Sequence, residues 1–290
     1  MGLSNTGKLT LYNGAADIGQ GSNTTLIQVC ADGLGLPMAQ FDYVMGDTDR
    51  TADAGKSSAS RQAFVSGNAA LLAGQDLRRK ILALANASTS AALTLEKDKV
   101  TVVDGDKKIL IDLAKLNTDK NGDALIGEGY FDPPTKLLDA DGQGIPYATY
   151  GFGAQIALVE VDMELGITKV LRIVAAHDVG KAINPQQVEG QIHGGIAQGL
   201  GMTLMEEYLP GLTDNLHDYL IPTVGDVPPI DVILIEDPEP LGPFGAKGVG
   251  EPALIPTPPA ILGAIRHATG VQMKFVPVTP HRLRAAILEK

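Results

Sequence analysis

The sequence contains no tryptophan, and aromatic residues make up only 4% of its 290 residues. Binding of nucleic acid through stacked bases needs aromatic side chains, so a surface of this class is not expected. Basic residues are also the minority: 34 Asp and Glu against 23 Lys and Arg give a net charge of -11. This charge opposes binding to nucleic acid or to an anionic membrane surface. The expected partners are small molecules and other proteins.

Cysteine occurs once, at Cys30, so the chain alone can form neither an internal disulfide nor a cysteine-ligated zinc or iron-sulfur site. A reducing, cytoplasmic location fits this composition. No signal-peptide pattern and no apolar run of membrane-spanning length is present. With 44% hydrophobic and 20% charged residues, the chain is expected to be globular, with a core built from aliphatic side chains.

Glycine, in contrast, is abundant, and its most informative cluster is Gly-Ala-Lys-Gly-Val-Gly-Glu-Pro at residues 245–252. Three glycines within six residues allow positive φ angles and a close approach to a ligand. Pro252 disfavours helical backbone at Glu251 and itself suits the first turn of a helix. We therefore expect Glu251 at a loop-to-helix junction, either as a cap on the helix or as an acid facing a bound molecule.

Hydrophobic periodicity and turn signals predict a mixture of helices and strands without regular alternation. Strands are expected over residues 8–13, 41–45, 99–103, 108–112, 147–162, 168–176 and 232–236, and helices over residues 22–34, 61–84, 185–201, 252–268 and 279–288. This order indicates an α+β fold rather than a doubly wound parallel sheet. The segments 15–19 and 176–180 are similar and each follow a strand, which suggests two similar mixed-sheet and helix units around a shared cleft. The predicted divisions are a first unit over residues 1–94, a loop-rich small subdomain over 95–146 and a second unit over 147–290.

Helix ends and interiors carry further signals. Ser22 is expected to cap the helix over residues 22–34, and Asn184 with Pro185 forms a strong helix start. The helix that starts there, expected over residues 185–201, contains five glycines, at positions 190, 194, 195, 199 and 201. Each glycine costs a helix interior about 1 kcal/mol relative to alanine. Close approach of a neighbouring helix or of a ligand would explain them.

Four loops are candidate site elements: residues 19–22, 56–62, 191–199 and 245–251. The first is a glycine turn into a helix N-terminus, whose free amides favour a phosphate, although the full dinucleotide fingerprint is absent. The second offers three hydroxyls, a guanidinium and an amide, suited to phosphate or to a polar heterocycle, or else a simple helix cap at Ser60. His177 and His193 do not have the spacing of metal ligands. With no nucleophile and no metal ligand, such a site fits a prefabricated cofactor.

Five motifs resemble, in order, those of the molybdenum-binding subunit of the xanthine dehydrogenase and aldehyde oxidase family. They are Gly-Gln-Gly-Ser at 19–22, Ser-Ala-Ser-Arg-Gln at 58–62, His-Asp-Val-Gly at 177–180 with Ile-Asn-Pro at 183–185, the glycine-rich segment 187–207, and residues 245–252. The resemblance covers nearly the whole chain. Within the family the chain is most similar to the split molybdopterin subunit of bacterial nicotinate dehydrogenase.

The resemblance implies molybdopterin, in its cytosine dinucleotide form, as the carrier of the molybdenum, with no protein ligand to the metal. It implies that Glu251 is the general base and that Gln198 lies near the metal's oxo group. The implied reaction is hydroxylation of a carbon in an N-heteroaromatic (nicotinate- or purine-like) substrate, with water as the oxygen source. The residues that it assigns to cofactor contacts are Gly19, Gln20, Gly21, Ser22, Ala59, Ser60, Arg61, Gln62, Gln191, Gly195, Gly248, Val249 and Gly250. Electrons would leave through iron-sulfur and FAD subunits on other chains.

The chain departs from the family because a large region that precedes residue 8 in family members has no counterpart here. We therefore expect a second molybdenum subunit that carries this N-terminal half. Three alternatives stay open: an aldehyde oxidoreductase of the same family, an inactive truncated fragment, and a phosphate-ligand binding module that uses only helix N-termini.

Overall fold

The computed structural model describes residues 1–290. The chain divides into two compact units, each described by itself. Unit 1 contains residues 1–150 and 238–248, and unit 2 contains residues 151–237 and 249–290. The main chain therefore passes between the units three times, once inside the glycine motif, between Gly248 and Val249.

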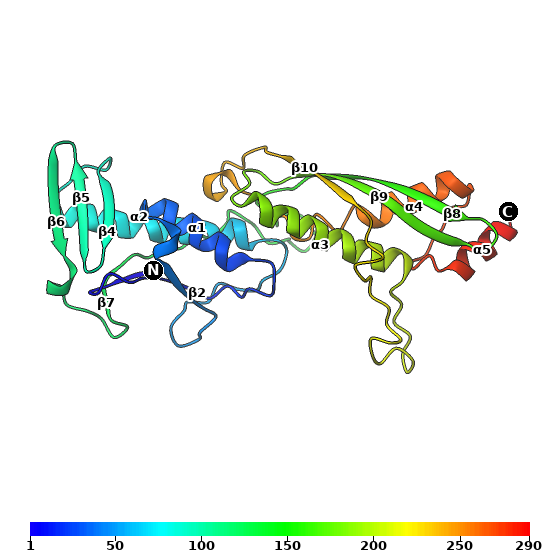
Figure 1. Cartoon of the computed structure of the whole chain (residues 1–290), viewed down its shortest axis with the longest axis horizontal. Helices are drawn as coiled ribbons and strands as arrows, with labels where there is room; N and C mark the ends of the chain where they lie inside the picture. Colours follow the sequence, from blue (N-terminus) through cyan, green and yellow to red (C-terminus); the bar gives the residue numbers. More distant parts are fainter. The chain divides into compact units, whose positions relative to one another are not determined.

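Unit 1 combines two sheets with two long helices (Figure 1). Its elements are β1 (Gly2–Ser4), β2 (Leu9–Asn13), α1 (Ser22–Leu34), β3 (Phe41–Met45), α2 (Gly67–Leu84), β4 (Ala92–Glu96), β5 (Lys99–Asp104), β6 (Lys107–Asp112) and β7 (Asp123–Ile126). One sheet has the order β3-β2-β1-β7 and the other the order β4-β5-β6. Both contribute buried aliphatic side chains to a single core with α1 and α2.

The two helices of unit 1 pack closely because of Gly74. A Cβ atom there would overlap the carbonyl oxygen of Cys30 on α1, so only glycine allows this crossing. Cys30 itself is fully buried beneath the crossing.

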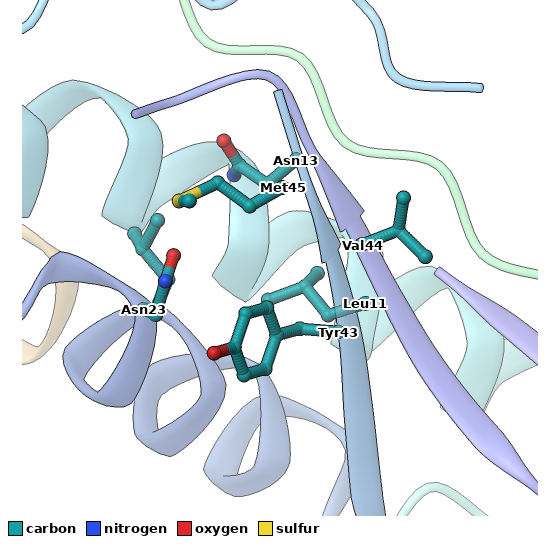
Figure 2. Close-up of a pocket in the computed structure, with 7 residues that line it drawn as sticks. Leu11, Asn13, Asn23, Tyr43, Val44 and Met45 are labelled. Carbon is teal, nitrogen blue, oxygen red and sulfur yellow. The ribbon is translucent and has the colours of Figure 1, made fainter. Parts of the chain in front are cut away.

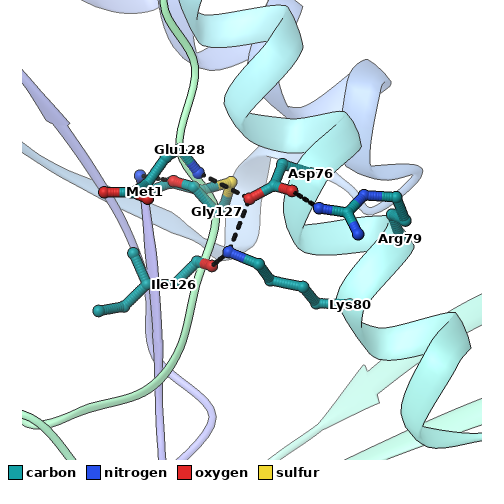
Figure 3. Close-up of polar contacts among 7 residues, drawn as sticks. All are labelled: Met1, Asp76, Arg79, Lys80, Ile126, Gly127 and Glu128. Carbon is teal, nitrogen blue, oxygen red and sulfur yellow. Dashed lines mark hydrogen bonds and ion pairs between the residues drawn. The ribbon is translucent and has the colours of Figure 1, made fainter.

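A polar network ties the segment after β7 to α2, as Figure 3 shows. The Asp76 carboxylate accepts the backbone amide of Glu128 at 3.0 Å and pairs with Lys80 at 2.8 Å and with Arg79. Lys80 also donates to the Ile126 carbonyl at 2.7 Å. These contacts hold an extended segment across the helix.

Unit 2 is one sheet packed against helices. Its elements are β8 (Gly153–Asp162), β9 (Ile167–Asp178), α3 (Pro185–Leu204), β10 (Ile230–Ile235), α4 (Thr257–Thr269) and α5 (Pro280–Leu288). The strand order is β10-β9-β8, and α4 packs against β8 (Figure 1). The core contains Ile173, Ile192, Ile196, Ile261 and Ile265, all 1% exposed or less.

The same topology occurs in both units. In unit 1, β1 and β2 are antiparallel, and α1 then connects β2 to a parallel β3. In unit 2, β8 and β9 are antiparallel, and α3 connects β9 to a parallel β10. The similar segments 15–19 and 176–180 lie where the chain leaves the central strand for its helix, and residues 176–178 still belong to β9. The fold class of two similar mixed units is confirmed.

Several expected boundaries are correct, whereas one helix cap, one helix start and one strand start are wrong. The helix over residues 22–34 has the predicted bounds, but its cap residue is Gly21 in left-handed conformation, and Ser22 makes no capping bond. The helix expected from residue 252 begins only at Thr257, because Pro256 disfavours helical backbone at the residue before it. The strand expected from residue 147 begins at Gly153, where its partner β9 ends opposite it. No helix in the structure is long and apolar enough to cross a membrane.

Candidate functional site

The loop that leads into α1 is organised by Asp17. Its Oδ1 accepts the amides of Gly19 at 2.9 Å and Gly21 at 3.2 Å, and its Oδ2 accepts the amide of Asn23 at 3.1 Å. Partial burial acts to raise the pKa of Asp17, but the three amide donors outweigh it and the pKa lies below its usual value. The amides expected to be free for a phosphate are thus partly occupied by a carboxylate of the same loop.

Gln20 closes this loop with its side chain. Its Oε1 accepts the amide of Ile18 at 2.6 Å, and its Nε2 donates to the carbonyl of Ala16 at 3.1 Å and to Ser22 Oγ at 3.2 Å. Ile18 is left 77% exposed, and a Cβ at Gly19 would meet no atom. The loop therefore presents its backbone at Gly19 to the outside.

The loop over residues 56–62 lies against this first loop. Ser57 Oγ donates to the Ala16 carbonyl at 2.9 Å and accepts Gln62 Nε2 at 3.1 Å. Arg61 Nη1 donates to the Ala54 carbonyl at 2.8 Å, so its guanidinium braces the loop. The structure thus brings two of the predicted cofactor loops together within unit 1.

Backbone strain marks the centre of the second loop. Ala59 and Ser60 have φ angles of 56° and 49°, which residues with a Cβ adopt only at a cost of about 1–3 kcal/mol each. The next residues, Gln62–Ser66, form a π-helical turn before α2, an arrangement often found at functional sites. Strain of this kind persists only where the surroundings hold it in place.

Gly248 provides one of those constraints. A Cβ at Gly248 would overlap the carbonyl oxygen of Ser60, so the glycine motif fits directly against the strained loop. Gly248 therefore has a steric reason to be glycine within unit 1. Val249 belongs to unit 2, where it packs against the core, and Gly250 is exposed.

A small hollow beside α1 is not the place for a large cofactor. It is lined by Leu11, Asn13, Asn23, Leu26, Tyr43, Val44 and Met45, and its cavity volume is only about 10 Å³, roughly the space of one water molecule (Figure 2). Sites for drug-sized ligands and cofactors occupy about 300–1,000 Å³. Met45 Sδ instead accepts the amide of Asp17 at 3.0 Å, which links this strand end to the first loop.

In unit 2, α3 carries the predicted side chains Gln191 and Gln198. Asn184 caps the helix, and its Oδ1 accepts the amide of Gln187 at 3.1 Å, as expected. Gln191 and Gln198 lie two helical turns apart, so they share one face, and Gln198 is exposed. Gly195 lies between them on the same face and is buried, and an added Cβ there would lie 2.7 Å from Ala253 Cβ.

That contact places the Glu251 turn beside the middle of α3. Residues 251–256 form successive turns, and the Leu254 amide donates to the Glu251 carbonyl at 3.0 Å. Ala253 is fully buried and Glu251 is exposed. A second glycine, Gly199, allows Thr257 to approach α3 one turn further along, with 2.5 Å between an added Cβ and the Thr257 Cβ.

Beneath the turn lies a polar cluster that sequence reasoning did not identify, with His177 and Thr257 buried and Gln155 half-buried. Gln155 Nε2 donates to the Ala253 carbonyl at 2.8 Å and lies 3.2 Å from His177 Nε2. Thr257 Oγ1 donates to Gln155 Oε1 at 2.7 Å. Burial lowers the pKa of His177, which is fully buried. Asp17 was missed as well, although its Asp-Ile-Gly sequence is typical of a side chain that bonds the amide two residues on.

The comparisons with known proteins explain why these loops occur together. A family model described as molybdopterin cofactor-binding domain matches residues 1–228. The chain belongs to that family. A xanthine dehydrogenase molybdenum-binding subunit of Escherichia coli is 32% identical over 97% of this chain and 38% of its own length. The nicotine 6-hydroxylase large subunit of Paenarthrobacter nicotinovorans is 31% identical over 97% of the chain and 35% of its own length.

Among solved structures, the aldehyde oxidoreductase of Desulfovibrio gigas superposes with a TM-score of 0.84 and 27% identity. That match covers 99% of this chain and 30% of the other. The resemblance to the xanthine dehydrogenase and aldehyde oxidase family is therefore confirmed. The chain spans about a third of the length of these relatives, between 30% and 38%.

The residues present fit a molybdopterin cofactor. Unit 1 offers hydroxyl, amide and backbone groups on two joined loops, with strained and exposed backbone at Ala59. Such groups match the hydrogen-bonding edges of a pterin and the oxygens of its phosphate. Unit 2 offers the exposed amide of Gln198 and the exposed turn at Glu251.

Proposed function

We propose that this chain is the cofactor-binding part of a molybdenum hydroxylase, an oxidoreductase that hydroxylates a carbon of an N-heteroaromatic substrate with water as the oxygen source. The observation that carries the proposal is the Glu251 turn. Its backbone is buried and fixed at Ala253, while the glutamate stands exposed beside the helix that carries Gln198. A fixed backbone with an exposed acid is the arrangement that a positioned proton acceptor needs.

The residues have distinct roles in this proposal. When bound, the molybdenum cofactor supplies the oxidising centre that takes an electron pair from the substrate. Glu251 would accept the proton that the attacking oxygen loses, and Gln198 would donate a hydrogen bond toward the bound group. The reaction converts a C–H bond and water into a C–OH group, protons and an electron pair.

Cofactor contacts in unit 1 are assigned to residues 19–22 and 59–62 and to Gly248. In unit 2 they are assigned to Gln191, Gly195, Val249 and Gly250. Gly19 and Ala59 present exposed backbone, Ser57 and Arg61 hold the two loops in shape, and Gly248 fixes the second loop at Ser60. We assign the cytosine dinucleotide form of molybdopterin to this site by family analogy.

The electron pair requires acceptors that this chain does not contain, and we assign them to iron-sulfur and FAD subunits in the cytoplasm. A second molybdenum subunit is a further proposed partner, because the relatives' names describe subunits of larger enzymes. Exposed apolar side chains on the outer face of the unit 2 sheet support such a partner. Ile156 is 72% and Leu158 57% exposed on β8, with Ile233 at 48% on β10.

The substrate class is supported by relatives whose names refer to xanthine and nicotine, both N-heteroaromatic compounds. The structural likeness to an aldehyde oxidoreductase favours an aldehyde as second candidate. To test this, the tagged chain is purified from cells with its partners, and molybdenum and the released nucleotide are quantified. Turnover of nicotinate, hypoxanthine, xanthine and a simple aromatic aldehyde is then measured with an artificial electron acceptor.

We expect stoichiometric molybdenum, a second molybdenum subunit, and oxidation of at least one heterocycle. Because a mismatch with the polar groups of a site can cost a factor of 10⁴ or more, the panel is expected to discriminate sharply. Oxidation of the aldehyde alone would refute the heterocycle assignment. Absence of molybdenum from the complex would refute the hydroxylase proposal itself.

A further inference from the structure

The polar cluster beneath the Glu251 turn has a defined hydrogen-bond pattern. Gln155 comes from β8, His177 from β9 and Thr257 from the start of α4. Because Gln155 Nε2 donates to the Ala253 carbonyl and its Oε1 accepts from Thr257, the orientation of the amide group is fixed. The second hydrogen of Nε2 therefore points to His177 Nε2, 3.2 Å away, and this ring nitrogen accepts it.

It follows that the His177 ring is neutral, with its proton on Nδ1. Nδ1 is buried and has no hydrogen-bond partner. A cationic ring would turn a donor toward the Gln155 amide, and burial disfavours that charge. The ring is held tightly, because a Cβ at Gly153, its neighbour across the strands, would lie 2.7 Å from Nδ1.

A polar cluster of this kind lowers the free energy of unfolding relative to apolar side chains that fill the same space. An unsatisfied buried donor typically costs about 1–3 kcal/mol, and apolar groups of the same shape would avoid this cost. The cluster contacts the turn at the Ala253 carbonyl, two residues beyond Glu251, which accepts Gln155 Nε2 at 2.8 Å and Thr257 Oγ1 at 3.3 Å. The Thr257 amide also donates to the Leu254 carbonyl at 3.1 Å.

Ala253 is fixed from two directions at once. Gly195 of α3 packs against its Cβ side, and Gln155 of β8 binds its carbonyl oxygen. The Leu254 amide returns to the Glu251 carbonyl at 3.0 Å, so rotation of Ala253 would also move the backbone of Glu251. A displacement of about 1 Å at a reacting group can cost roughly a hundredfold in rate.

We propose that Gln155 and His177 are positioning residues that hold the Glu251 turn in its working orientation through the Ala253 carbonyl. The inference rests on the proposed role of Glu251 and adds two residues that do not themselves touch the substrate. Gln155 carries the bond to the turn, and His177 fixes the amide group of Gln155 from the opposite side.

The first test replaces Gln155 with leucine, which keeps a similar volume and removes the amide. Gln272→Leu, at an exposed position of the same unit, is the matched control. Amide hydrogen exchange of residues 251–257 is measured in the full-length chain by mass spectrometry. We expect exchange in this segment to become at least about tenfold faster in Gln155→Leu and to stay at the parental rate in Gln272→Leu. Thr257→Val, a milder change, is expected to act in the same direction.

The second test measures kcat and KM of the molybdenum-loaded complex. Gln155→Leu is expected to lower kcat by about 10- to 100-fold with KM changed less than about threefold, because the base moves while substrate contacts remain. His177→Gln retains an acceptor for the Gln155 amide and is expected to keep kcat near the parental value. His177→Leu removes the acceptor and is expected to resemble Gln155→Leu.

Parental exchange in both Gln155→Leu and His177→Leu would overturn the inference, as would equal kcat losses in His177→Gln and His177→Leu. If Glu251→Gln abolishes turnover while Gln155→Leu leaves kcat unchanged, the positioning role is wrong and the proposed function stands. If Glu251→Gln keeps parental turnover, the role of the base is wrong, and the positioning inference is overturned with it.

Discussion

Gly195 and Gly194 form a natural pair for testing how α3 supports the Glu251 turn. They are adjacent in the same helix, so replacing either with alanine brings the same gain in helix propensity, about 1 kcal/mol. They differ in their surroundings. A Cβ at Gly195 would lie 2.7 Å from Ala253 Cβ and 3.0 Å from the Leu254 nitrogen, whereas a Cβ at Gly194 would meet no atom within 4 Å.

Carbon atoms pack best at about 3.5–4.0 Å, so Gly195→Ala must move the turn or the helix by roughly 1 Å. Overpacking of this kind typically costs about 1–3 kcal/mol. After the propensity gain, we expect Gly195→Ala to lower the free energy of unfolding by up to about 2 kcal/mol. Gly194→Ala is expected to raise it by up to about 1 kcal/mol.

The assay is urea unfolding of the full-length chain followed by far-UV circular dichroism. The difference between the two variants removes the shared propensity and isolates the packing cost, so it is expected to be about 1–3 kcal/mol. Equal stabilisation by both substitutions would refute the close approach of Ala253 to α3, and with it the support assigned to the Glu251 turn.

Two further predictions concern unit 1. The hydrogen bond from Lys80 lowers the pKa of Asp76 to about 2. Burial acts in the opposite direction, and the Glu128 amide and Arg79 lower the pKa further. The ionised carboxylate therefore stabilises the fold above the usual carboxyl pKa of about 4, and this contribution is lost as the pH falls toward about 2. Asp76→Asn is expected to lower the free energy of unfolding by roughly 1–2 kcal/mol at neutral pH. The same variant is expected to show a smaller change in stability between those two pH values. Burial raises the pKa of the Cys30 thiol to about 12, so a thiol reagent at neutral pH is expected to label Cys30 in urea and not in the native chain; rapid native labelling would contradict its burial.

Local signals account for what the sequence predicted correctly. The α1 bounds, the Asn184 cap and the strand over residues 41–45 depend on neighbours in the chain, and all three are observed. The similar segments 15–19 and 176–180 correctly indicated two units of one topology.

Features that depend on distant contacts were not predictable in this way. The cluster of Gln155 and His177 exists only because β8 and β9 pair in a register that sets Gly153 opposite His177. No sequence pattern predicts that register, and the spacing of His177 indicated only that it is not a metal ligand. The hydrogen bonds of the Asp17 carboxylate to its own loop could have been predicted from the local turn sequence. The contact between Gly248 and Ser60 could not, because the two residues are far apart in the sequence.

The central claim is that Glu251 is the proton acceptor of a molybdenum hydroxylase, and Glu251→Gln in the purified, molybdenum-loaded complex tests it most directly. The substitution keeps the shape of the side chain and removes its basicity. A positioned general base typically contributes 10² to 10⁴ in rate, so we expect turnover to fall at least about a hundredfold while the molybdenum content stays at the parental level. Parental turnover with normal molybdenum content would contradict the claim.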